Sequence, residues 1–334
     1  MRFARLPRLR LASIALAAVT TACGDPEPGA GESSTGSSGS ASGSGSTTAT
    51  DASASTTVST TTMSTTDEGS SGGSDGTSAA DSGGDSSSSG GIPTEPFSFF
   101  VTSLRAMQEL SGSEAGFGGD LRFGETGPGA GLRGADLICG AIADRSMPGA
   151  SAKGWRAFLS ATDDGNGNVV HAIDRVGEGP WYDRLGRVLA LKKADLMAAR
   201  PTSADPAIIN DFPNEDGVPN HAPDPGKGQV DNHDMLTGSN TEGKLYAASA
   251  TCLDWTGNKG DTATEGKPRV GHSWPRGGGG GPGGDSGAHW MSSLTESGCA
   301  PGVNLIEQGG PKPNEVTVVS GGGYGGFYCF ALTP

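Results

Sequence analysis

The sequence predicts an α+β domain with short twisted strands, one or two helices, long loops and two disulfides, placed after a disordered tether. Three observations support this fold class. The chain holds an even set of four cysteines in its last two-thirds, at positions 139, 252, 299 and 329, and such a set in an exported chain indicates a disulfide frame. Helical periodicity is scarce, and the strand-like runs are few and short. Glycine is abundant, with 58 of 334 residues, which favours a loop-rich domain.

Residues 1–22 have the features of a secretory signal peptide. A basic start is followed by a short apolar run at 11–19 and by small residues before Cys23, which is the pattern of an export signal. The run is too short to cross a bilayer, which takes about 20 apolar residues. The segment resembles the lipobox of bacterial lipoproteins, in which the cysteine is lipidated. The alternative is ordinary cleavage near Ala22, which would leave Cys23 as a free thiol.

Residues 23–94 are predicted to be a disordered linker after the lipidated Cys23. Serine, glycine, threonine, alanine and aspartate make up almost all of the segment from 24 to 94, which has no Lys or Arg and nine acidic residues. Such a segment cannot bury enough apolar surface to offset the entropy lost on ordering. We therefore expect a flexible acidic stalk between the membrane anchor and the domain.

The remaining residues, 95–334, are predicted to form one domain. They carry 28 acidic and 19 basic residues, a net charge of −9. An acidic domain without a basic stripe argues against nucleic acid and against heparin-like polyanions as partners. No second apolar segment in the sequence is long enough to span a membrane.

The local patterns within the domain predict few regular elements. The best helix candidate is 134–146, where apolar residues recur on one face at a spacing of three to four, and a second short helix is expected near 191–199. Strand-like runs cover 98–102, 154–160, 316–320 and 326–331. Residues 200–240 are rich in Pro, Asp and Asn and show little pattern, so they are expected to be a long surface excursion.

Several short sequence motifs of the domain, taken in order, resemble those of a known family. They are Phe-Phe-Val-Thr at 99–102, Gly-Leu-Arg-Gly-Ala-Asp-Leu-Ile-Cys at 131–139, Gly-Trp-Arg-Ala-Phe-Leu-Ser at 154–160, Leu-Thr-Gly-Ser-Asn-Thr-Glu-Gly at 236–243, Thr-Cys-Leu-Asp-Trp at 251–255, Ser-Gly-Cys at 297–299 and Phe-Tyr-Cys-Phe at 327–330. This series resembles endostatin, and still more the related bacterial secreted domain of unknown function that is common on lipoproteins. The resemblance implies a C-type-lectin-like fold.

The resemblance also implies a disulfide pairing, although four cysteines alone allow three pairings. The family pairs them in a nested way, which implies Cys139–Cys329 and Cys252–Cys299. The family's chemistry does not carry over. No histidine precedes His171, so the endostatin zinc site has no counterpart, and the acidic charge does not suit its heparin surface. The calcium and sugar motifs of C-type lectins have no proper match either.

Two acidic segments are candidates for calcium binding. The segment 163–168, Asp-Asp-Gly-Asn-Gly-Asn, has the oxygen spacing that opens an EF-hand loop but lacks the later ligands, and a tight turn explains the same residues. The second candidate is the excursion around 211–234, where dense oxygen ligands suit calcium but also suit a merely solvated loop. Its candidate ligands are Asp211, Glu215, Asp216, Asp231 and Asp234. In the same segment His221 and His233 could bind a transition metal with Asp231 or Asp234.

No catalytic signature stands out, and we predict that the protein is not an enzyme. The sequence has no nucleophile elbow, no zinc-protease helix and no phosphate-binding loop. Trp274 and Trp290 lie near glycine-rich segments and are a candidate platform for a ligand, although the resemblance favours a packing role for Trp290.

Together these observations predict a bacterial lipoprotein anchored in the cell envelope, at the outer membrane or cell surface. Its endostatin-like domain is expected to bind an extracellular protein or glycan through the long loops, with no cofactor certain and calcium as one candidate. The alternatives are a structural envelope protein without a specific ligand and an enzyme of unknown class.

Overall fold

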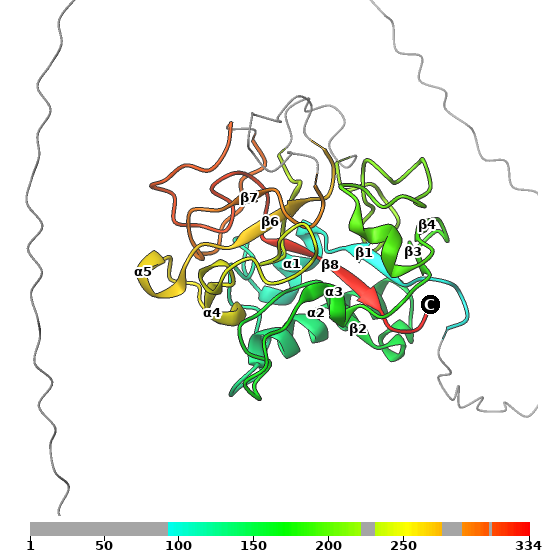
Figure 1. The fold of residues 1–334 in the computed structure, drawn as a ribbon, viewed down its shortest axis with the longest axis horizontal. Helices are drawn as coiled ribbons and strands as arrows, with labels where there is room; N and C mark the ends of the chain where they lie inside the picture. Colours follow the sequence, from blue (N-terminus) through cyan, green and yellow to red (C-terminus); the bar gives the residue numbers. More distant parts are fainter. Residues whose placement is uncertain (1–92, 222–230, 276–288, 307–308) are drawn as a thin grey trace, which may run out of the picture. The chain divides into compact units, whose positions relative to one another are not determined.

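The computed structural model describes residues 93–221, 231–275, 289–306 and 309–334 (Figure 1). The predicted signal peptide, Cys23 and the tether up to residue 92 lie outside this part of the chain. The described part is mixed α+β, with few helices, small sheets and two disulfides, as the sequence predicts. None of its helices is long and apolar enough to cross a membrane.

The central element is β8 (Gly326–Ala331), which is buried along its whole length and runs through the middle of the domain (Figure 1). Its sequence, Gly-Phe-Tyr-Cys-Phe-Ala, is an unbroken apolar run, as expected for a strand covered on both faces. One edge pairs antiparallel with β1 (Phe99–Val101). The other edge pairs in its first half with β5 (Asp234–Leu236), in parallel, and in its second half with β2 (Trp155–Ala157), antiparallel.

Beyond β5 the sheet continues through β6 and β7, giving the strand order β1-β8-β5-β6-β7. The strands β6 (Arg269–His272) and β7 (Leu294–Thr295) are antiparallel to their neighbours. In the pairing of β5 with β6, Asp234 lies opposite His272 and Leu236 lies opposite Val270. This register places the first residue of β5 beside the last residue of β6.

The helix α2 (Ala130–Ser146) packs beside β2 and β8 and confirms the predicted helix, with a start four residues earlier. Its Cys139 is buried and forms a disulfide with Cys329 of β8. Gly134 allows close packing, because a Cβ atom there would lie 2.1 Å from the carbonyl oxygen of Arg122. The helix therefore packs at this point against the backbone of a loop.

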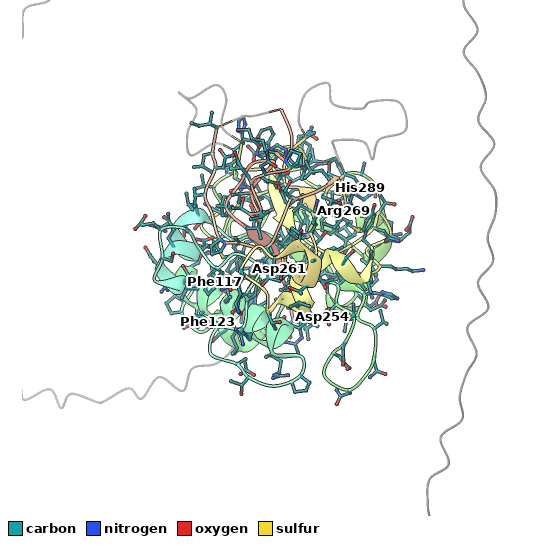
Figure 2. The ribbon with its side chains drawn as sticks, turned by 90° about the vertical axis from the view of Figure 1, so that its left-hand side faces the viewer. Phe117, Phe123, Asp254, Asp261, Arg269 and His289 are labelled. Atoms are coloured by element: carbon teal, nitrogen blue, oxygen red, sulfur yellow. A yellow bond between two sulfur atoms is a disulfide. The ribbon has the colours of Figure 1, made fainter. Side chains whose placement is uncertain are left out.

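The second disulfide, Cys252–Cys299, joins α4 (Cys252–Trp255) to the segment after β7. Both pairings are those that the resemblance implies. All four residues of α4 have positive φ, from 50° to 66°, so this turn is left-handed, a conformation that L-residues rarely adopt in succession. Its contacts hold it in place: Thr162 N donates to Asp254 Oδ1 at 2.7 Å, and Trp255 Nε1 donates to the carbonyl of Ser160 at 2.9 Å. Asp254 is labelled in Figure 2.

The other elements are short and surround the sheet. They are α1 (Leu104–Ser111), η1 (Ala150–Lys153), α3 (Ala172–Arg175), β3 (Trp181–Tyr182), β4 (Val188–Ala190), η2 (Lys193–Met197), η3 (Ala248–Ala250) and α5 (Thr262–Glu265). The predicted helix at 191–199 is the 3-10 turn η2, and α1 has no counterpart among the predicted elements. β3 and β4 form a separate two-stranded sheet.

Two expectations for local structure are wrong. The run 316–320 does not form a strand, because only Thr317 makes a β-bridge, to Ala300. The segment 200–240 is not a surface excursion in its described parts. It contains β5, and Arg200 fixes its start to the core by donating to the carbonyls of His272 at 2.6 Å and Ser273 at 2.5 Å. Hydrogen bonds between buried polar groups keep this segment in the interior, and a search for hydrophobic patterns does not detect such bonds.

Candidate functional site

A cluster of titratable side chains lies buried where β5, β6 and the segments beside them meet. We call it the His–Asp cluster: His233, Asp234 and His272, with Asp231 and Glu296 beside them. Their exposed fractions are between 0% and 3%. Asp234 begins β5, His272 ends β6 and Glu296 follows β7. The strand register therefore brings together residues that lie far apart in the sequence.

Asp234 is at the centre of the cluster. Its Oδ1 lies 2.9 Å from His272 Nε2 and 3.4 Å from His233 Nε2. The two imidazole rings are nearly perpendicular, with centroids 4.0 Å apart. Among the residues that the structure describes, these three side chains are the one group of three His, Cys, Asp or Glu whose ligand atoms all lie within 4.8 Å of one another.

The other nitrogen of each histidine has its own neighbour. Asp231 Oδ1 lies 2.9 Å from His233 Nδ1, and Ser293 Oγ lies 3.2 Å from His272 Nδ1. Both rings are thus held on their Nδ1 side, which fixes their orientation, and both turn Nε2 towards Asp234. This arrangement is typical of histidines whose Nε2 has a common target.

The two innermost carboxyls have opposite electrostatic environments. Burial alone would raise the pKa of Asp234, but the adjacent His233 and His272 outweigh it, and the pKa of Asp234 lies below its ordinary value. Burial and the negative charge of Asp234 raise the pKa of Glu296 well above its ordinary value. Glu296 Oε2 accepts hydrogen bonds from Ser320 Oγ at 2.6 Å and Gly321 N at 2.7 Å. The pKa values of the two carboxyls are therefore shifted in opposite directions, so that Asp234 loses its proton more readily than Glu296.

A glycine loop, 321–323, closes over the carboxyl groups. A Cβ atom on Gly321 would lie 3.2 Å from both Asp234 Oδ2 and Glu296 Oε1, and one on Gly322, whose φ is +132°, would lie 2.3 Å from Asp231 Cγ. The two glycines thus let the backbone approach the carboxylates more closely than a side chain would permit. This close approach of backbone to carboxylates explains the Gly-Gly-Gly sequence at 321–323.

A cavity of about 360 Å³ opens at the start of α1. Amides are the most frequent side chains in its wall, and an exposed ion pair between Arg105 and Asp216, 2.9 Å apart, lies at its edge. Tyr324 is held there by a hydrogen bond from its hydroxyl to the carbonyl of Thr102 at 2.7 Å. The lining residues are Ser103, Leu104, Arg105, Gln108, Asn214, Asp216, Asn220, Asn232, Leu305 and Tyr324.

The cavity and the His–Asp cluster share one segment of chain. Asn232 lines the cavity, and its neighbours Asp231 and His233 belong to the cluster. Asn232 is fixed by reciprocal bonds: its Nδ2 donates to the carbonyl of Asn220 at 2.6 Å, and Asn220 Nδ2 donates to the carbonyl of Asn232 at 2.9 Å. A shift of Asp231 or His233 would therefore move Asn232 in the cavity wall.

The structure does not bring the five candidate calcium ligands together. Glu215 accepts hydrogen bonds from the backbone and hydroxyl of Ser103, Asp216 pairs with Arg105, and Asp211 accepts from the backbone of His221. Only Asp231 and Asp234 enter one site, and they do so on either side of His233. Residues 222–230 of this candidate segment lie outside the described residues.

The two candidate platform tryptophans have different positions. Trp290 is fully buried in the aromatic core, with its ring 4.7 Å from Phe158 and its Nε1 bonded to the carbonyl of Leu196. It has no face on which a ligand could stack, so its role is packing. Trp274 is partly buried, and its ring contacts His221 at 4.2 Å and His233 at 4.5 Å.

The acidic turn at 163–168 is a hairpin-like turn, which is the interpretation that the sequence favours over a calcium loop. Asp163 Oδ1 accepts from Gly165 N at 2.7 Å and from Gly167 N at 2.8 Å, and both glycines have positive φ. An antiparallel bridge between Ala161 and Val170 closes the turn. The oxygens that the sequence offers to an ion are thus used on the turn's own backbone.

A second open hollow, of about 540 Å³, lies beside Phe117 and Phe123, whose rings meet edge to face at 6.0 Å (Figure 2). It holds no group of potential metal ligands and, in the residues described, no side chain with a strongly shifted pKa. We therefore do not assign it a function.

Sequence reasoning missed His272 and Glu296. His233 was paired with His221, its neighbour in sequence, whereas the structure pairs it with a histidine 39 positions away. The run Arg-Val-Gly-His at 269–272 does not alternate between polar and apolar residues, so no local signal marks His272 as part of a strand. Glu296 precedes the Ser-Gly-Cys motif at 297–299 and is not among the candidate residues of the sequence. Comparison with known proteins gives no match for this chain, since no family model, no curated protein and no solved structure matches it.

Proposed function

We propose that this chain is a cell-envelope lipoprotein of a bacterium whose domain binds a glycan in the cavity at the start of α1. The observation that carries the proposal is the chemistry of the cavity wall. Gln108, Asn214, Asn220 and Asn232 line it. Asn220 and Asn232 use both ends of their amides within the protein. Gln108 and Asn214 use one end each, which leaves Gln108 Oε1 as an acceptor and Asn214 Nδ2 as a donor for sugar hydroxyls. The volume, about 360 Å³, falls in the range of small-ligand sites.

The rim of the cavity adds a charged contact. Arg105 is 70% exposed at its side chain and pairs with Asp216. An exposed ion pair contributes little to stability, at most about 1 kcal/mol, so this pair is free to exchange Asp216 for a ligand group. The rigid wall and the exposed rim together favour ligand binding over a purely structural role.

An endostatin-like, C-type-lectin-like fold is part of the same proposal. Three features support it: the nested disulfides, the strand β8 that carries the last cysteine in the centre of the sheet, and α2 attached to that strand through Cys139. Superposition of an experimentally determined structure on endostatin would test it, and a different strand order around β8 would refute it.

Anchoring through a lipidated Cys23 completes the proposal. The tether then displays the domain away from the outer membrane or cell surface. Mass spectrometry of the mature N-terminus should find an acylated Cys23. An unmodified cysteine, or an N-terminus at another residue, would refute the anchor without affecting the proposal for the cavity.

The ligand is tested on an array of bacterial and host glycans together with matrix proteins, with calcium and with chelator. We expect binding to one class of glycan. An array that stays blank in both conditions would contradict the binding function and favour a passive structural head, and binding to matrix proteins alone would contradict the assignment to glycans.

Two matched variants locate the binding site. Arg105→Ala removes an exposed arginine from the cavity rim, and Arg145→Ala removes an arginine that pairs with Glu109 at 2.8 Å outside that cavity. Both lose one exposed ion pair, so their stabilities should change equally little. We expect Arg105→Ala to weaken glycan binding about fivefold or more, and Arg145→Ala to leave it unchanged. Equal loss in both variants would show that the cavity is not the site.

A further inference from the structure

We propose that His233, Asp234 and His272 bind a divalent transition metal ion, with Zn²⁺ as the best match, at a buried site behind the cavity wall. Two imidazole nitrogens and a carboxylate oxygen form a donor set that zinc prefers. The three donor atoms lie within 4.8 Å of one another. This inference is independent of the proposed glycan site, which does not use the three residues.

The distances suit a common ion. Zinc holds nitrogen and oxygen ligands at about 2.0–2.2 Å, so two neighbouring ligands of a tetrahedral ion are about 3.3 Å apart. Asp234 Oδ1 lies 2.9 Å and 3.4 Å from the Nε2 atoms of His272 and His233. An ion placed among the three atoms needs only small side-chain adjustments. The antiparallel pairing of Asp234 with His272 fixes the backbone of two of the ligands in advance.

The surroundings of the two histidines have the form of an outer shell. A metal-binding histidine usually holds a carboxylate, hydroxyl, carbonyl or water on its second nitrogen, which orients the ring. Here Asp231 lies at His233 Nδ1 and Ser293 lies at His272 Nδ1. Both Nε2 atoms are thereby left on the side of Asp234, where the proposed ion would lie.

The carboxylates supply a second, independent observation. Asp234 and Glu296 are 2% and 0% exposed. Within the described residues, neither oxygen of Asp234 accepts a hydrogen bond of good geometry, nor does Glu296 Oε1. Buried polar atoms without such bonds are rare in folded proteins and need an explanation. A cation beside Asp234 Oδ1 provides one, because it would complete the surroundings of a carboxylate whose near neighbours, His272 and Glu296, do not meet it with good hydrogen-bond geometry.

The glycine loop is consistent with this role. Gly321 and Gly322 leave space that a Cβ atom would fill against Asp231, Asp234 and Glu296. Glu296 stands outside the group of three and contacts Asp234, so it is an outer carboxylate and not a ligand. Three protein ligands leave the fourth position of a tetrahedral zinc to a small molecule such as water.

The test uses the full-length chain, purified in detergent, stripped with chelator and then titrated with ZnCl2. We expect about one Zn²⁺ per chain by elemental analysis and a higher thermal midpoint with zinc than with chelator. His272→Gln and Asp234→Asn should lower zinc affinity about tenfold or more and abolish the rise in midpoint. His221→Gln is the matched control, because His221 lies in the same region and contacts Trp274 but not the cluster.

Co²⁺ provides a readout that does not depend on variants that fold poorly. Cobalt in a four-coordinate site with nitrogen and oxygen ligands absorbs strongly in the visible range, so the stripped wild-type chain should turn coloured on addition of CoCl2 and lose the colour when ZnCl2 displaces the cobalt. No tight zinc binding by the wild type, or no four-coordinate cobalt spectrum, would overturn the proposal. Equal zinc affinity in the wild type, His272→Gln and Asp234→Asn would also overturn it.

Discussion

Asp234 and His272 are directly opposite each other in the pairing of β5 with β6, and their side chains meet with Oδ1 and Nε2 2.9 Å apart. Both are buried. A buried carboxylate is tolerated when a positive or hydrogen-bonding partner compensates for its lost hydration. Asp234 is the residue that both histidines approach, and the stability of this part of the sheet should depend on it.

The first prediction concerns the metal-free protein. Asp234→Asn keeps the shape of the side chain but removes the charge between two imidazoles. We expect it to lower the free energy of unfolding by about 3 kcal/mol, as does the removal of one partner of a buried charged pair. Urea unfolding in the presence of chelator measures this value. A change below about 1 kcal/mol would show that Asp234 does not stabilise the cluster.

Glu296→Gln is the contrasting variant. Glu296 is buried against the negative charge of Asp234, which it contacts. A glutamine can still accept from Ser320 and Gly321, and its amide group can donate to Asp234. We expect the unfolding free energy to be unchanged within about 1 kcal/mol, or raised, because the substitution removes a like-charge contact and supplies a donor. A loss as large as that of Asp234→Asn would contradict this account.

The sequence predicted those parts of the fold that have a strong local pattern. The apolar residues that recur on one face at 134–146 predicted α2, and the apolar run at 326–331 predicted β8. The strands β5 and β6 were not predicted, because each is only three or four residues long and includes a buried charged residue, such as Asp234 or Arg269. Their burial depends on tertiary partners, which no pattern within one segment encodes.

The candidate site was predictable only in part for the same reason. His233 and Asp234 were among the candidate ligands because they are close in sequence. His272 joins them through strand register, and Glu296 joins them through the pairing of β6 with β7. Register is set by long-range packing and could not be obtained without knowing that β5 and β6 are neighbours.

The next prediction is a pH dependence that arises from Glu215. Burial raises the pKa of Glu215 above its ordinary value of 4.5, and Asp216 adds to this, although hydrogen bonds from Ser103 oppose it. A carboxyl whose pKa is higher in the folded state stabilises the fold at low pH, and this contribution is lost as the pH rises from about 4.5 through the folded-state pKa. Glu215→Gln lacks this titration. The stability of the wild type relative to Glu215→Gln should therefore fall over that window and then level off.

Urea unfolding of the wild type and Glu215→Gln at a series of pH values from about 4 to 8 measures this difference. Glu114→Gln, at an exposed site, is the control and should follow the wild type. Parallel curves for the wild type and Glu215→Gln would show that burial does not raise the pKa of Glu215.

The left-handed turn at α4 leads to a prediction of increased stability. Leu253 has φ 54° and ψ 51° and its side chain is half exposed. Left-handed geometry costs an L-residue about 1–2 kcal/mol, and glycine avoids this cost although it loses more entropy on folding. We expect Leu253→Gly to raise the free energy of unfolding by up to about 1 kcal/mol. Leu137→Gly, at a similarly exposed leucine in α2, should instead lower it by about 1 kcal/mol. Destabilisation by both variants would show that the turn is not strained at this residue.

The two disulfides should contribute unequally to stability. Cys139–Cys329 closes a loop with a sequence separation of 190, and Cys252–Cys299 one of 47. In the chain-entropy model these loops correspond to about 5 and about 4 kcal/mol. Cys252–Cys299, the inner disulfide, also holds Cys252 at φ 50° in the left-handed turn, so its removal lets a strained segment relax.

Cys139–Cys329, the outer disulfide, instead attaches α2 to the central strand β8. Replacing Cys139 and Cys329 together by alanine should therefore cost at least about 1 kcal/mol more than replacing Cys252 and Cys299. Chemical denaturation of the two double variants measures the difference, and an equal or reversed order would show that the inner disulfide is the stronger constraint.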